Sequence, residues 1–108
     1  MDAQLKKGIL EVCVLAELCQ GESYGYRIQR DISQWITLSE SALYHILKRH
    51  EQAGLVSARS VEHSGRLRRM YSITDAGMAR LMDFKTEWQE TLRAIEFIDK
   101  AVEEHDKE

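Results

Sequence analysis

Three arginines beside one predicted turn are the residues of this sequence best suited to bind a polyanion. Arg66, Arg68 and Arg69 lie on or just after a turn between two strand-like runs, residues 55–62 and 67–73. Such runs around a short glycine-containing turn predict a β-hairpin. Guanidinium groups bind phosphate through charge-assisted hydrogen bonds. The hairpin therefore favours contact with a nucleic acid backbone.

The segment before the hairpin has the sequence of a short amphipathic helix. Residues 39–53 form this predicted helix, which Ser39 can cap at its start and Gly54 can end. In a winged helix-turn-helix, such a helix lies in the DNA major groove, while the hairpin reaches phosphates or the neighbouring groove. The sequence therefore predicts a winged helix-turn-helix in a mostly α fold with a small β-hairpin.

The predicted helix buries one apolar stripe and turns its other side chains outward. The stripe comprises Ala42, Leu43, Ile46, Leu47 and His50. Lysine and arginine supply phosphate or guanine contacts, while tyrosine and serine donate hydrogen bonds to phosphates or base edges. The DNA-binding candidates of helix and hairpin are Ser41, Tyr44, His45, Lys48, Arg49, Arg66 and Arg68. The alternatives are a plain solvated helix face and hairpin, and an ion pair between Arg49 and a carboxylate.

The charge of the chain is unevenly distributed. The chain has 108 residues, a length typical of a single domain, and its net charge is −3. Residues 1–26 carry two Lys or Arg against four Asp or Glu, residues 27–80 carry nine against five, and residues 81–108 carry four against nine. The positive charge therefore lies on the segment with the hairpin, and the acidic end is a solubilising tail.

Several functional classes have no support in the sequence. No apolar run approaches a membrane span and the first residues lack a signal peptide, so we expect a cytoplasmic protein. Cys13 and Cys19 lie six apart on one predicted helix and cannot pair, which leaves buried thiols or a redox sensor. The histidines have no metal-ligand spacing, and no catalytic or phosphate-loop motif is present. We expect no enzyme activity, metal or cofactor.

Helices are also predicted on both sides of this central segment. Residues 5–18 have helical apolar spacing, with Gly21 just beyond them. Ser23 can cap a second helix over residues 24–34. A last helix is predicted from residue 75 to residue 103, which is about 42 Å long at 1.5 Å per residue.

The last helix carries apolar residues three or four apart along most of its length. This stripe comprises Leu81, Phe84, Trp88, Leu92, Ile95, Ile98 and Val102. Such spacing is typical of a coiled-coil contact, and a second copy of the chain is the simplest partner. We therefore divide the chain into a winged helix-turn-helix, residues 1–74, and a dimerisation helix with an acidic tail, residues 75–108.

Five short motifs occur in a familiar order. They are Tyr24-Gly25-Tyr26-Arg27-Ile28, Ser41-Ala42-Leu43-Tyr44, Ala53-Gly54-Leu55-Val56, Gly65-Arg66-x-Arg68-Arg69-x-Tyr71 and Ile73-Thr74-x-Ala76-Gly77. With them the sequence resembles the PadR family of bacterial transcriptional regulators over residues 5–98. The short length and single final helix resemble the small subfamily that includes multidrug-sensing repressors.

The resemblance implies a homodimer that binds a two-fold related DNA operator and represses transcription. In the drug-sensing members, tryptophans of the two final helices hold a planar aromatic ligand in a central pore. The matching positions, and hence the ligand candidates, are Trp88, Leu5, Gly8, Glu11, Val12 and Leu92. Three positions depart from the family pattern, namely His45, His50 and Met70. A winged helix that binds another protein and no DNA is the alternative function.

Overall fold

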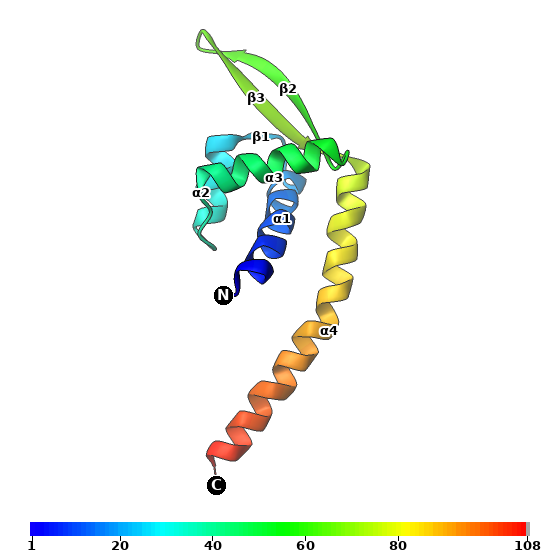
Figure 1. Ribbon diagram of the computed structural model, residues 1–108. Coiled ribbons are helices and arrows are strands. Elements are labelled where there is room, and N and C mark those ends of the chain that lie inside the picture. Colours follow the sequence, from blue (N-terminus) through cyan, green and yellow to red (C-terminus); the bar gives the residue numbers. More distant parts are fainter. Residues whose placement is uncertain (108) are drawn as a thin grey trace.

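The computed structural model describes residues 1–107, which form four helices and a three-stranded antiparallel sheet. The elements are α1 (Ala3–Cys19), β1 (Ser23–Tyr24), α2 (Gly25–Ser33), α3 (Glu40–Gln52), β2 (Val56–His63), β3 (Arg66–Ile73) and α4 (Asp75–Asp106). Figure 1 shows α1, α2 and α3 grouped beside the sheet, and α4 leaving this group as a long projecting helix. The predicted mostly α architecture with a β-hairpin is confirmed.

The hairpin, called the wing below, consists of β2 and β3 paired in antiparallel register. The register runs from Val56 opposite Ile73 to His63 opposite Arg66. Ser64 and Gly65 form the connection with φ angles of 51° and 78°. Two consecutive positive φ angles are those of a type I′ turn, whose twist matches that of the paired strands.

The sheet has a third strand that the sequence patterns did not predict. β1 pairs with β3, so that Ser23 lies opposite Tyr71 and Tyr24 opposite Met70. The expectation that Ser23 caps α2 is wrong, because Tyr24 holds the capping position and forms no side-chain hydrogen bond there. Ser23 is instead buried in the strand. A strand of two residues shows no alternation from which it could be recognised.

The core lies between α1, α2, α3 and the base of the sheet. Leu15 and Leu18 of α1 pack with Ile28 of α2 and Leu43 of α3, and all four are almost completely buried. Ser39 caps α3 as predicted, since its hydroxyl accepts a hydrogen bond from the backbone N–H of Ala42. The core therefore fixes which side of α3 faces outward.

α4 starts against the wing and ends far from it. The hydroxyl of Thr74 accepts from the N–H of Gly77 and donates to the carbonyl oxygen of Gly54. A Cβ atom on Gly77 would collide with the carbonyl oxygen of Leu55 and lie 2.7 Å from Cγ1 of Ile73. The first turn of α4 is thus held tightly by the elements from α1 to β3, called the winged body below, whereas its second half projects beyond α1 (Figure 1).

Candidate nucleic-acid interface

The outer face of α3 presents four polar side chains away from the core. Because the buried residues define one side of the helix, 3.6-residue periodicity places the opposite side at Ser41, His45, Lys48 and Gln52, all of which are exposed. Gln52 was not among the candidates from the sequence, although it stands four residues after Lys48. An exposed helix face with hydroxyl, imidazole, ammonium and amide groups can donate to and accept from base edges and phosphates.

Tyr44 lies toward the wing, at the edge of a groove. The groove has a volume of about 490 Å³ and runs between α3, the start of α2 and the wing. Its lining includes four tyrosines and three arginines, which are Tyr24, Tyr26, Tyr44, Tyr71, Arg66, Arg68 and Arg69. Tyr26 was missed as a candidate, but it is 68% exposed and its motif position was visible in the sequence. The fold thus gathers cationic and hydroxyl groups from three separate segments.

Gly25 permits the position of the Tyr44 ring. A Cβ atom at Gly25 would collide with the Tyr44 hydroxyl and lie 2.8 Å from Cζ of the ring. Gly25 is the first residue of α2, where backbone N–H groups have no partner within the helix. The Tyr44 hydroxyl therefore lies beside the positive end of a helix, an arrangement that suits an anion.

The wing arginines differ in what holds them. Arg66 is exposed at the tip, whereas the guanidinium of Arg68 lies 3.8 Å from the ring centroid of Tyr24. Arg69 forms an ion pair at 2.8 Å with Glu51 of α3, and this carboxylate raises the pKa of the guanidinium. Stacking orients Arg68 without neutralising it, so Arg66 and Arg68 keep their charge available to phosphate.

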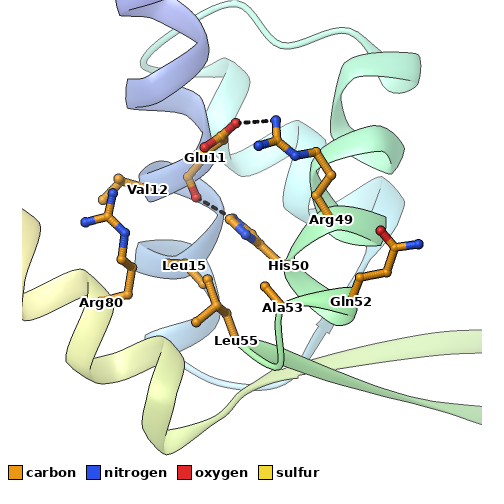
Figure 2. Close-up of a pocket in the computed structure, with 9 residues that line it drawn as sticks. All are labelled: Glu11, Val12, Leu15, Arg49, His50, Gln52, Ala53, Leu55 and Arg80. Carbon is orange, nitrogen blue, oxygen red and sulfur yellow. Dashed lines mark hydrogen bonds and ion pairs between the residues drawn. The ribbon is translucent and has the colours of Figure 1, made fainter.

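Arg49 lies on the other side of α3 and is bound by α1. Its Nη1 is 2.8 Å from Oε1 of Glu11, and Nε2 of the buried His50 is 2.7 Å from the backbone oxygen of Glu11 (Figure 2). The two residues line a cleft of about 420 Å³ that also includes Arg80 of α4. Arg49 thus forms the carboxylate pair that the sequence left open, while its contact with DNA stays a prediction.

The apolar stripe predicted along α4, from Leu81 to Val102 and called the α4 seam below, divides into a covered and an exposed part. Leu81, Phe84 and Trp88 are half-buried, and the rings of Phe84 and Trp88 stack with centroids 5.3 Å apart. The remaining members are about half exposed, at 48% for Leu92, 45% for Ile95, 56% for Ile98 and 54% for Val102. Within residues 1–107, this part of the seam has no partner.

The predicted ligand residues of α1 do not share one environment. Leu5 and Gly8 are exposed, and Val12 is buried. The carboxylate of Glu11 points to Arg49 rather than standing free (Figure 2). Trp88 is half-buried and Leu92 is about half exposed, and ligand binding at these positions stays a prediction.

Residues 1–107 contain no group of three His, Cys, Asp or Glu side chains that could hold a metal ion, and no helix there is long and apolar enough to cross a membrane. Both cysteines are free. Cys13 is half-buried, which raises its pKa, but the expectation that Cys19 is buried is wrong because it lies exposed at the end of α1.

The helix, groove and wing define the class of winged helix-turn-helix proteins. The pattern of the transcriptional regulator PadR-like family matches residues 14–83, and the chain belongs to this family. Proteins of this family are transcriptional regulators that bind DNA, and not enzymes.

Solved structures agree with this assignment. A protein from Streptococcus mutans is 38% identical, with 83% of this chain and 85% of that chain covered and a TM-score of 0.76. A PadR-like transcriptional regulator from Bacillus cereus is 30% identical, with coverage of 89% and 96% and a TM-score of 0.78. Bacillus subtilis PadR, solved in complex with operator DNA, is 27% identical over 70% of this chain and 46% of that chain, with a TM-score of 0.65.

Proposed function

We propose that this protein is a ligand-responsive repressor that binds a pseudo-palindromic operator as a homodimer. Residues 1–74 bind the DNA and residues 75–108 form the dimer. The observation that carries this proposal is the exposed polar face of α3 beside the cationic wing. Because the operator is genomic DNA, we expect the protein to act in the cytoplasm.

In this proposal α3 enters the major groove and the wing binds the flanking backbone. Ser41, His45 and Lys48 contact base edges or phosphates, and Arg66 and Arg68 bind phosphates. The Bacillus subtilis PadR that resembles this chain was solved with operator DNA, which supports the same use of the domain here. Two copies related by a two-fold axis place their α3 helices about 34–36 Å apart, one turn of DNA.

The dimer forms through the exposed half of the α4 seam. Leu92, Ile95 and Ile98 have no partner among the described residues. Leaving them in water is unfavourable by about 25 cal/mol for each Å² of apolar surface. A second α4 in the coiled-coil arrangement covers the same residues on both copies, as two-fold symmetry requires.

The ligand site lies at Trp88, near the middle of α4. One face of the indole stacks on Phe84, so a planar aromatic guest binds the other face with the partner's Trp88 on its far side. Leu5, Gly8 and Leu92 complete the site from exposed positions. Such a guest releases the operator only if it binds better to one separation of the two winged bodies.

DNA binding is tested with fragments of the region upstream of the gene, by fluorescence anisotropy at stated salt. We expect specific binding that Lys48→Gln and Tyr44→Phe both weaken. Lys100→Gln, on α4 and far from α3, is the control and leaves binding unchanged. Absence of binding by the wild type contradicts the proposal and favours the winged helix that binds protein alone.

Ligand binding is tested by quenching of tryptophan fluorescence with planar cationic dyes and phenolic acids. Trp35, which is 90% exposed, is replaced by Phe so that Trp88 is the sole indole. We expect quenching, and release of operator DNA by the same compounds. If no planar aromatic compound quenches Trp88, the residue serves packing only and the repressor has no ligand at this site.

A further inference from the structure

A second pair of cations lies beside α3, on the side away from the wing. Lys6 and Lys7 of α1 line a hollow of about 270 Å³ together with Ala42, His45 and Ile46 of α3. His45 belongs to the outward face of α3, so the hollow opens at the edge of that face. Figure 1 shows the wing on one side of α3 and the first half of α1 on the other.

The width of the DNA major groove determines what lies beside each flank of a helix bound in it. A helix with its side chains is about 10–12 Å wide, and the major groove is about 12 Å wide. A helix that fills the groove therefore has one phosphate backbone along each flank. With α3 in the groove, the wing would lie on the side of one backbone and the first two turns of α1 on the side of the other.

Two acidic residues close to these lysines in sequence have partners other than the lysines. Asp2 accepts a hydrogen bond from the N–H of Leu5, and Glu11 pairs with Arg49. Within residues 1–107, Lys6 and Lys7 form no ion pair. Although residues 1–26 have a net negative charge, they therefore place two ammonium groups without an ion pair next to α3.

The burial of the two lysines suits contact with a backbone. Lys7 is exposed, and Lys6 is half-buried against the hollow. The walls of the hollow come largely from Ala3, Leu10 and Ile46, on which the methylene stem of a lysine can pack while its ammonium reaches outward. A lysine held by its stem loses less conformational freedom when it binds phosphate.

We propose that Lys6 and Lys7 bind operator phosphates on the side of the major groove opposite the wing. The two flanks of α3 then clamp both backbones of one groove. This inference rests on the proposed operator binding, and it adds a contact from α1, an element outside the helix-turn-helix and the wing.

The test measures the salt dependence of operator affinity for the full-length protein. Each phosphate contact contributes about 0.9 to the slope of log affinity against log salt. Because the homodimer carries both lysines twice, Lys6→Gln/Lys7→Gln removes four phosphate contacts and should lower that slope by about 3.6. The advantage of the wild type then shrinks about 150-fold between 50 and 200 mM salt. Affinity for scrambled DNA should fall by a similar factor, because phosphate contacts are not sequence-specific.

Two further variants complete the design. Lys100→Gln/Lys107→Gln changes the net charge equally at the far end of α4 and should leave the slope unchanged. Lys6→Arg/Lys7→Arg keeps the charge and should retain the wild-type slope, which separates charge from folding. An unchanged slope for the glutamine pair, or an equal fall in the α4 control, overturns the inference while operator binding stands. Failure of the wild type to bind DNA overturns both proposals.

Discussion

α1 and α4 are both helices with a regular apolar stripe, yet only one of them buries it within the chain. Leu15 and Leu18 of α1 are 1% and 2% exposed, because α2, α3 and the sheet surround them. Leu92 and Ile98 of α4 are 48% and 56% exposed, because α4 extends past the winged body (Figure 1). An apolar stripe therefore indicates that a helix packs against a partner. Whether the same chain supplies that partner depends on which elements surround the helix in the fold.

The largest effect is expected when charges are placed on the exposed half of the α4 seam, which tests whether a second copy covers it. Leu92→Glu/Ile95→Glu should give monomers, because unpaired charges are costly to bury. Operator affinity should then fall about 100-fold or more, since two linked half-sites become independent. Sedimentation and anisotropy measure the two effects. Phe97→Glu, a matched change on the opposite face of α4, should leave the dimer intact, and an intact Leu92→Glu/Ile95→Glu dimer would contradict the proposed interface.

The joint between the two regions is probed at Gly77. A methyl group in Gly77→Ala meets the carbonyl oxygen of Leu55 and the side chain of Ile73, so the variant should lose about 1–3 kcal/mol of unfolding free energy. Denaturant unfolding at fixed protein concentration measures this loss. Gly8→Ala is the control, because its Cβ has no neighbour within 4 Å in the chain. Equal stability of the two variants would show that α4 is not held at its first turn.

Within the winged body, the Tyr44 ring packs so closely against Gly25 that a larger residue there would displace it. Gly25→Ala should displace the Tyr44 ring and lower operator affinity about tenfold, which equals about 1.4 kcal/mol. Tyr44→Phe should cause a similar loss, and the double variant should lose little more, because both changes remove one contact. Strictly additive losses would mean that Gly25 acts on DNA binding without Tyr44.

The smallest effect expected concerns the carboxyl pair that joins α1 to α2. Burial, followed by a hydrogen bond with Asp31, raises the pKa of Glu17 to about 7 from 4.5, against the lowering influence of Arg27 and Arg30. A raised pKa stabilises the fold below about pH 4.5, and this stabilisation is lost as pH rises through 7. The melting temperature should therefore fall from pH 5 to 8 more in the wild type than in Glu17→Gln. Parallel profiles would show that Glu17 titrates normally.

Much of the candidate site could be predicted from local patterns. The cap at Ser39 and the inward residues of α3 follow from periodicity, which leaves Ser41, Tyr44, His45 and Lys48 outside. β1 could not be predicted, because two residues form a strand only when β3 offers them a free edge. The place of Tyr26 in the groove also depends on tertiary structure, because packing brings the start of α2 close to the wing.

By itself, the sequence determined the helices, the wing, the exposed side of α3 and the need of α4 for a partner, because these depend on residues close together along the chain. Only the tertiary structure decided which charges remain free. Arg49 and Arg69 are paired with Glu11 and Glu51. Lys6, far from α3 in sequence, lies beside it with no ion pair to any residue that the structure describes. Ion pairs join side chains across the fold, and their distances are set by how the helices pack.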